Sequence, residues 1–343
     1  MLRWLRARGF RACRCRGPHA VRAGVGRGRR VTEVLLAFWD GAFGSVYAVL
    51  SATLVRATPL LFVGLAVALA FRAGVLNIGA EGQLIVGAIG ASAVALAIPA
   101  WPRPVVIVLM LVAGAVAGGL WAGIAAVLRR RFHVLEVIST LMLNFVAAAL
   151  IGWVVRGPLQ EPTRVYPMSE SFSAAARWPF LVPGQRLHLG FVLGLVTAAV
   201  LWYVLQHTAA GFRVRAVGAG ARAAASAGAV PVARVASRAF LASGMLAGLA
   251  GASEVGGVTW ALYEGISPGY GYTAIAVALL ARLDPRWVIV TAIGFGALEA
   301  GGAAMQRSAG VPAVAVQIVT AAVLLSVLAL SRWRARDRDE ASA

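Results

Sequence analysis

Apolar segments follow one another along the chain from Val34 onward, separated by short stretches rich in proline, glycine or arginine. A helix needs about 20 predominantly apolar residues to cross the hydrocarbon core of a bilayer. The pattern therefore predicts a series of membrane-spanning helices joined by short turns. The predicted spans are 46–71, 84–98, 105–128, 138–155, 189–205, 240–258, 272–283, 287–304 and 311–330.

Two longer polar stretches interrupt this series, and their arginine content predicts the orientation of the spans. The 206–239 stretch carries five arginines and no acidic residue, which predicts that it lies in the cytoplasm. The 156–188 stretch carries five prolines, and its acidic residues partly offset its arginines, so we expect it outside. The arginine triplet at 129–131 and the tail, 332–343, belong on the cytoplasmic side by the same rule.

The start of the chain does not fit the pattern. Residues 1–30 contain ten arginines and no acidic residue, and they lack the apolar stretch of a signal peptide. We expect 1–31 to be a basic arm without fixed structure and 32–331 to form the membrane domain. Nine spans with a cytoplasmic C-terminus put the N-terminus outside, which its arginines oppose. Either 34–55 forms a tenth span, or a first span is missing and the arm is a misassigned start or a replacement.

Composition supports an all-α polytopic membrane protein with about nine or ten transmembrane helices. Hydrophobic residues make up 60% of the 343 residues and charged residues only 13%, which excludes an ordinary soluble domain and a disordered chain. All 32 basic residues are arginine. A Walker A loop requires lysine, so any ATP that drives this protein is hydrolysed by another subunit.

The net charge of +19 raises the question of nucleic acid. Much of that charge lies in the arm and in the predicted cytoplasmic loops, so we expect contact with membrane lipid and no nucleic-acid partner. Cys13 and Cys15 lack the second pair of a zinc site, and the four histidines are scattered. The sequence shows no nucleophile–base pair and no metal constellation, so we predict neither an enzyme nor a cofactor.

The first segment with several polar residues between apolar spans is 72–83. Three glycines loosen this stretch, while Asn77, Glu81 and Gln83 bring polar side chains to it. Non-helical backbone at membrane depth is tolerated only inside protein or beside a watery cavity, and broken helices often line transport paths. The alternative is an ordinary interfacial turn with a hydrated glutamate. The residues alone leave these two interpretations even.

A second polar group lies at the start of the 138–155 span. Glu136, Thr140 and Asn144 recur every four residues and therefore share one helix face. Such a stripe faces a pathway or bonds a neighbouring helix; we favour helix bonding for Asn144, while Glu136 has a simple partner in the arginines at 129–131. Glu254 and Glu299 also lie in or near spans, where charges are costly; each either serves function or bonds a neighbouring helix end.

The third segment is 211–228 in the predicted cytoplasmic loop. Its alanine-rich part favours a short helix, bounded by glycines and Pro231. Such a helix either docks a partner or is an inert surface turn or a basic helix on anionic headgroups. From the residues alone the inert interpretation is favoured.

These segments together resemble the permeases of ABC importers of the sugar and nucleoside group, relatives of the ribose and branched-chain amino-acid permeases. The resemblance runs from about 41 to 330 and rests on four motifs in the family's order. They are 58–83, ending Asn77-Ile-Gly-Ala-Glu-Gly-Gln83; Glu136-Val-Ile-Ser-Thr-Leu-Met-Leu-Asn144; Gly211-Phe-Arg-Val-Arg-Ala-Val-Gly218; and Ser243-Gly-Met-Leu-Ala-Gly-Leu-Ala-Gly251.

The resemblance implies an ABC importer permease fold in the cell membrane, with a cytoplasmic ATPase, a second homologous permease and an external substrate-binding lipoprotein as partners. The chain looks like the longer permease of a nucleoside pair. The resemblance also implies that 211–228 holds the coupling helix that meets the ATPase. The coupling residues are then Gly211, Phe212, Arg215, Ala216, Gly218, Ala223, Ala224 and Gly228.

The chain departs from the family at two places. Gly220-Ala221 stands where the family usually has a polar residue near the start of the coupling helix, and loss of such an N-cap costs about 1 kcal/mol. The arginine-rich arm also stands where the family has a hydrophobic first span.

The resulting hypothesis is ATP-driven uptake of nucleosides or related sugar-containing solutes. The substrate-pathway candidates are Asn77, Glu81, Gln83, Thr140 and Asn144. The alternatives are a permease for simple sugars or branched-chain amino acids and, from another class, an ion-coupled secondary transporter that uses Glu81, Glu254 or Glu299.

Overall fold

A computed structural model describes residues 27–132, 134–226 and 230–310, together with seven further positions between 312 and 326. Most of the predicted arm, the greater part of the predicted span 311–330, the tail 332–343 and the coupling candidate Gly228 lie outside the described residues. Everything said below about the structure concerns the described part of the chain.

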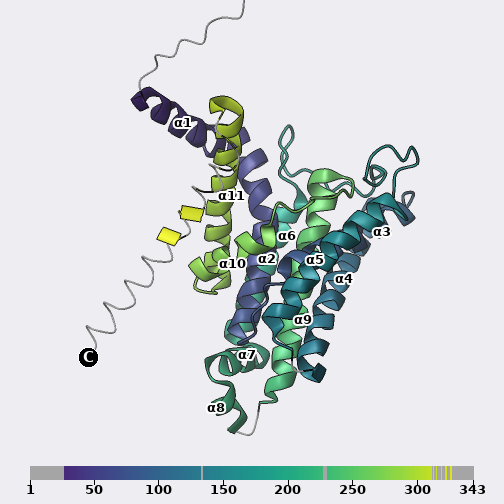
Figure 1. Cartoon of the computed structure of the whole chain (residues 1–343), viewed down its shortest axis with the longest axis vertical. Helices are drawn as coiled ribbons and strands as arrows, with labels where there is room; N and C mark the ends of the chain where they lie inside the picture. Colours follow the sequence, from purple (N-terminus) through teal and green to yellow (C-terminus); the bar gives the residue numbers. More distant parts are fainter. Residues whose placement is uncertain are drawn as a thin grey trace, which may run out of the picture.

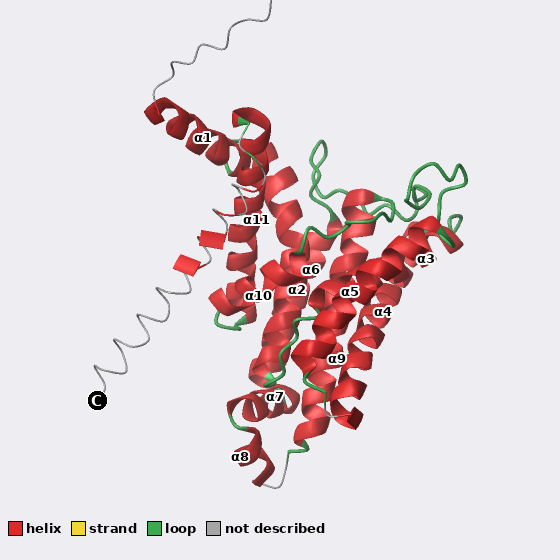
Figure 2. Ribbon diagram, in the orientation of Figure 1, coloured by secondary structure: helices red, strands yellow, loops and turns green. Residues whose placement is uncertain are grey.

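The described residues form helices joined by turns and loops, without a β-strand (Figure 2). Two of the elements are π-helices, η1 and η2, which extend α2 and α9 respectively. In chain order the elements are α1 (Arg27–Ala42), η1 (Ala48–Thr53), α2 (Leu54–Arg72), α3 (Ala80–Ala97), α4 (Arg103–Phe132), α5 (Glu136–Arg156), α6 (Leu189–His207), α7 (Ala209–Ala219), α8 (Ala221–Ser226), α9 (Val232–Glu254), η2 (Val255–Thr259), α10 (Tyr270–Leu280) and α11 (Pro285–Ala309).

Seven helices are long and apolar enough to cross a membrane, and each coincides with one of the predicted spans. The prediction of an all-α polytopic membrane protein is therefore confirmed. The expectation of a full span at 272–283 is wrong. The helix there, α10, has 11 residues, or about 16 Å at 1.5 Å per residue, against a hydrocarbon core of about 30 Å.

The end of α10 explains why this helix is short. Arg282 and Leu283 adopt positive φ angles of 53° and 61°, which a right-handed helix cannot accommodate. Asp284 then caps α11, because its carboxylate accepts a hydrogen bond from the backbone N–H of Arg286 at 3.0 Å, and Pro285 follows at the first helical position. Asp284 and Pro285 therefore mark the turn between α10 and α11.

The N-terminal region forms a separate helix rather than a tenth span over 34–55. Helix α1 begins at Arg27, within the predicted arm, and ends at Ala42, before the turn at 43–45. It packs along α11, where Phe38 contacts Gly301 and Gly41 lies against Ala304. Figure 1 shows α1 at the end of the bundle opposite α7 and α8.

Helix α9 lies at the centre of the bundle, packed against α2, α3 and α4 (Figure 1). Glycines allow this close approach: a Cβ on Gly248 would lie 2.0 Å from the carbonyl oxygen of Gly114, and one on Gly118 would lie 2.4 Å from that of Gly244. Small residues at such crossings let helix backbones meet in membrane proteins. Gly114 and Gly118 on α4 and Gly244 and Gly248 on α9 therefore pack two helices of the same chain together.

Replacing Gly118 by alanine is expected to destabilise the bundle by about 1–3 kcal/mol, because the added methyl overlaps α9 backbone. Gly123→Ala on the same helix is the matched control, since a Cβ there meets only the Leu241 side chain at an ordinary 3.4 Å. Removing a helical glycine by itself stabilises by up to about 1 kcal/mol. Thermal unfolding in detergent measures both; equal unfolding temperatures for the two variants would contradict the packing.

Candidate functional site

The polar segment 72–83 is a true break between α2 and α3. Helix α2 ends at Arg72 and α3 begins at Ala80, with Gly74 at a φ of 73° between them. Asn77 is fully buried and Gln83 is 1% exposed. The structure therefore favours a broken helix at 72–83 over an interfacial turn with a hydrated glutamate.

The Asn77 amide holds this break together. Its Nδ2 donates to Gln83 Oε1 at 2.8 Å and to Ser243 Oγ at 2.7 Å, and its Oδ1 accepts from the Gly79 N–H at 3.1 Å. Ser243 on α9 in turn donates to the backbone carbonyl of Ala66 on α2 at 2.7 Å. Buried polar groups need such partners, and this chain of bonds joins α2, the break and α9.

Asn144 supplies the second connection, from α5. Its Oδ1 accepts from the backbone N–H of Gly82 at 2.9 Å, and its Nδ2 donates to the Ile78 carbonyl at 3.0 Å and to the Tyr272 hydroxyl at 3.2 Å. The Gly82 N–H is one of the first donors of α3, which have no partner inside their own helix. Asn144 thus caps α3 from a neighbouring helix, as the helix-bonding interpretation predicts.

Glu81 joins the N-termini of two helices. It lies in the first turn of α3, and its carboxylate accepts from the Gly271 N–H in the first turn of α10 at 2.6 Å. Helix N-termini carry partial positive charge, which favours a carboxylate. Gly271 must be glycine for this contact, because a Cβ would lie 2.4 Å from the Glu81 backbone nitrogen.

The other two members of the α5 stripe have local roles. Thr140 Oγ1 donates to the Glu136 carbonyl of its own helix at 2.7 Å, and its side chain fills the space beside Gly79. Glu136 forms the expected ion pair with Arg129, at 3.0 Å. The five pathway candidates therefore gather at one place, around the start of α3, but protein groups occupy the polar atoms of Asn77, Gln83 and Asn144.

Ser243, Gly271 and Tyr272 complete this site, and sequence reasoning did not assign them a role in it. Ser243 begins one of the four recognised motifs and is a polar residue in a run of small and apolar ones, which is a detectable signal. Gly271 and Tyr272 carry no such signal, because their role depends on where α10 docks.

The cytoplasmic loop of the prediction forms two short helices, α7 and α8, at one end of the bundle (Figure 1). Thr208 caps α7 by accepting from the Gly211 N–H at 3.1 Å. Gly220, in extended backbone, separates the two helices. The alanine-rich helix expected after Gly220 is present as α8.

Helix α7 rests directly on the end of α2. A Cβ on Gly218 would lie 1.9 Å from the Arg72 carbonyl oxygen, and one on Gly211 would lie 2.1 Å from that of Val204. Glycine at both positions therefore lets α7 lie against α2 and α6. Arg215 has a buried Nη1 without a hydrogen-bond partner among the described residues.

The remaining coupling candidates divide by exposure. Phe212 is 60% exposed on α7, although it is a large apolar side chain. Ala223 is exposed on α8, Ala216 is partly buried and Ala224 is buried. Phe212 and Ala223 are thus accessible to a partner, whereas Gly211 and Gly218 pack against the bundle.

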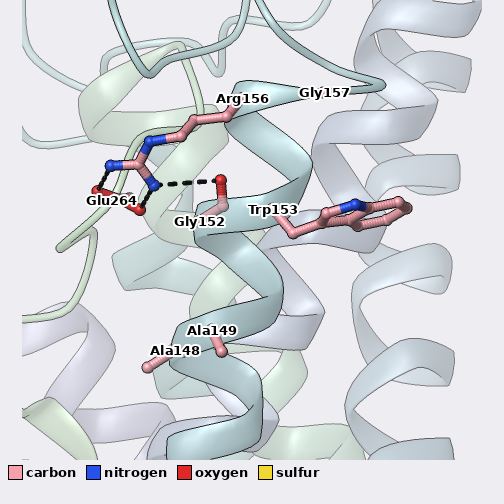
Figure 3. A pocket seen from close by; sticks show the side chains of 7 residues that line it. All are labelled: Ala148, Ala149, Gly152, Trp153, Arg156, Gly157 and Glu264. Carbon is pink, nitrogen blue, oxygen red and sulfur yellow. Dashed lines mark hydrogen bonds and ion pairs between the residues drawn. The ribbon is translucent and has the colours of Figure 1, made fainter.

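The 157–188 segment crosses the opposite end of the bundle and is bonded to the chain after α9. The backbone N–H groups of Ser169, Phe172 and Trp178 donate to the carbonyls of Leu262, Trp260 and Gly256 at 2.7, 2.8 and 2.9 Å. Figure 3 shows the cavity beside this segment, about 400 Å³ in volume, at the end of α5. Arg156 and Glu264 form a bidentate ion pair at its edge.

His188 fixes the junction of this segment with α6. Its Nδ1 accepts from the Gly190 N–H at 3.1 Å, and its ring lies against Gly257. Burial, with a smaller contribution from Arg186, lowers the pKa of His188 from 6.5 to about 4. The imidazole is therefore neutral at physiological pH.

Helices of spanning length, a break at the start of α3 and two short helices at one end are the features of a multi-pass membrane protein. The described residues hold no group of three or more His, Cys, Asp and Glu side chains that would bind a metal ion. The chain belongs to the family described as "Branched-chain amino acid transport system / permease component", which matches residues 49–328. The predicted membership of the ABC importer permeases is confirmed.

Three relatives illustrate the range of this family. A glucose ABC transporter permease of Haloferax volcanii is 39% identical over 81% of this chain and 76% of the relative. A guanosine ABC transporter permease of Bacillus subtilis is 38% identical, over 88% and 86%. A nucleoside ABC transporter permease of Lactococcus lactis is 28% identical, over 80% and 78%.

Replacing Asn144 by alanine is expected to destabilise the protein by about 1–3 kcal/mol, since the Gly82 N–H and the Ile78 carbonyl lose their partner in a buried site. Thr140→Val is the matched control on the same helix face, because it removes only a bond within α5 and keeps the side-chain volume. Unfolding in detergent measures both variants. A tolerated Asn144→Ala would refute the capping role.

The free energy of unfolding is expected to decrease as the pH is lowered, because the unfolded chain protonates His188 before the folded protein does. Because its folded pKa is about 4 and its unfolded value 6.5, the unfolded chain takes up a proton first. The stabilisation is complete above about pH 6.5 and declines by up to about 3 kcal/mol towards pH 4. His188→Asn keeps an acceptor at the N-cap without titrating there, so its unfolding temperature should lack this component; His207→Asn, at an exposed position, should retain it.

Proposed function

We propose that this permease imports nucleosides or sugars as one of two homologous membrane subunits, with a cytoplasmic ATPase and an external binding lipoprotein. Support for the substrate class comes from the relatives, whose names specify glucose, guanosine and nucleosides. These solutes share an uncharged ring with several hydroxyl groups. The ATPase would dock on α7 and α8, and the binding protein would dock partly on 156–188. The C-terminus would lie in the cytoplasm, as its arginines predict.

The observation that carries this mechanism is the contact of Gly218 with the end of α2. A push on α7 reaches Arg72, which is the last residue before the break. The break is bonded to α9 through Asn77 and to α10 through Glu81. Movement of the ATPases would thus be transmitted to helices around a cavity between the two permeases, and ATP hydrolysis itself would take place on the partner subunit.

Substitutions can separate docking of the ATPase on α7 and α8 from transmission of its movement to α2. Phe212→Asp should remove the exposed apolar contact, so the ATPase no longer copurifies with the permease and uptake is lost. Gly218→Val should leave the ATPase bound but abolish uptake, because the side chain displaces α7 from α2. Gly220→Ala is the control, since a Cβ there meets only Ala223 at 3.6 Å.

These variants are measured by pull-down, by radiolabelled uptake and by the amount of permease in the membrane. Normal uptake by Gly218→Val at a normal membrane level would refute the coupling assignment. Competition by leucine but by neither guanosine nor glucose would replace the substrate class with branched-chain amino acids. Uptake that an ionophore collapses, with no ATPase in the pull-down, would favour the ion-coupled transporter.

A further inference from the structure

Three charged side chains outside the break come from helices that pack against one another, because α2 contacts both α9 and α11. Arg56 lies in the first turn of α2, Glu254 ends α9, and Glu299 lies on α11. Glu254 interacts electrostatically with Glu299 and Arg56, and so does Tyr270 at the start of α10. We call Arg56, Glu254, Tyr270 and Glu299 the outer polar cluster.

Helix packing brings these residues together. Gly296 on α11 lies against α2, where a Cβ would be 2.6 Å from the Thr53 carbonyl oxygen and 2.8 Å from the Ala57 nitrogen. Glu299 follows Gly296 by three residues and therefore lies on the same face of α11. Arg56 lies between Thr53 and Ala57 on the facing turn of α2.

Neither carboxylate of the outer polar cluster is paired within the described residues. The ion pairs found there join Arg129 to Glu136, Arg156 to Glu264 and Arg286 to Asp284. Glu254 is only 6% exposed, and no side chain or N–H of the described part hydrogen-bonds its carboxylate. Arg56 Nη1 donates a long hydrogen bond, 3.4 Å, to the Ala52 carbonyl of the preceding turn.

An unpaired buried carboxylate is costly and is retained in membrane helices mainly where function uses it. The local backbone agrees with such a use. The π-helix η1 ends just before α2 and Arg56, and the π-helix η2 begins directly after Glu254. Short π-helical segments occur frequently at functional sites.

The outer polar cluster is also connected to the 157–188 segment. Arg186 interacts electrostatically with Glu254, and its backbone N–H donates to Ser51 Oγ in η1 at 2.9 Å. The Ser51 hydroxyl donates to Gln185 at 2.8 Å. The outer polar cluster therefore lies next to the 157–188 segment, on which we propose that the binding protein docks.

The geometry points to the outer polar cluster as the place where the permease recognises the hydroxyl groups of an uncharged sugar ring. Carboxylates accept hydrogen bonds from hydroxyls, whereas guanidinium and phenol groups donate to ring and hydroxyl oxygens. Glu254 and Glu299 supply the acceptors, and Arg56 and Tyr270 supply the donors.

This inference rests on the proposed function, and its first test compares substrates that differ by one hydroxyl. The importer is expressed with its partner subunits, and uptake of radiolabelled guanosine and 2′-deoxyguanosine is measured. Glu254→Gln and Glu299→Gln should each lower guanosine uptake at least tenfold and bring the ratio of the two uptakes towards one. Glu33→Gln, on exposed α1 surface, is the control and should change neither.

Membrane levels of each variant separate lost recognition from lost folding, and Glu299→Gln, at the less buried position, serves if Glu254→Gln fails to fold. An equal fall in the uptake of both nucleosides at a normal membrane level would assign these carboxylates a purely structural role and overturn the inference.

A second test does not depend on uptake. Glu299→Cys is made in a chain in which Cys13 and Cys15 are serine, and its reaction with a polar thiol reagent is followed. Guanosine or glucose should slow the labelling at least fivefold, whereas leucine should not. Ser308→Cys, at an exposed position of the same helix, is the control and should be labelled without protection.

The outcomes of the labelling test are distinct from failure of the proposed function. If the wild-type importer takes up neither nucleosides nor sugars, the proposed function fails, and protection by leucine then identifies the outer polar cluster with another solute. Absence of labelling at Glu299→Cys, or labelling that no solute changes, overturns the inference even where guanosine and glucose are taken up.

Discussion

The structure depends on satisfying the backbone polar groups of a helix break that is surrounded by apolar helices. The N–H groups at the start of α3 have no partner within their helix, and leaving them unpaired in an apolar environment would cost several kcal/mol each. Asn77 and Asn144 provide acceptors for Gly79 and Gly82. The same two amides bind Ser243 on α9 and Tyr272 on α10, so satisfying the break also fixes the positions of its neighbours.

The break connects α7 and α8 to the rest of the bundle. Helix α7 contacts Arg72, the last residue of α2, through Gly218. The break that follows Arg72 leads directly to α3. A continuous helix in place of the break would transmit movement only along its own axis. Because the break and the start of α3 are hydrogen-bonded to α5, α9 and α10, a movement of α7 can reach all three of these helices.

The sequence predicts the membrane helices well because their signal is local. A run of apolar residues is a helix in the membrane whatever it packs against, and seven predicted spans coincide with observed helices. The motif glycines, the Asp284-Pro285 turn and the Arg129–Glu136 pair are local in the same sense. The length of α10 is not, since an apolar stretch at 272–283 gives no sign that Arg282 and Leu283 turn to positive φ.

By itself the sequence determined the class of protein, the positions of seven long helices and the polar residues that gather at the helix break. Only the tertiary structure decided what those residues do. Asn77, Gln83 and Asn144 lie together at the break, and their polar atoms bond protein groups. Glu254 and Glu299, which the sequence marks only as charges in spans, have no ion-pair partner in the described part of the chain. Hydrogen-bond partners come from helices distant in sequence, so periodicity can place a polar side chain on a face but cannot say whether that face meets a protein group.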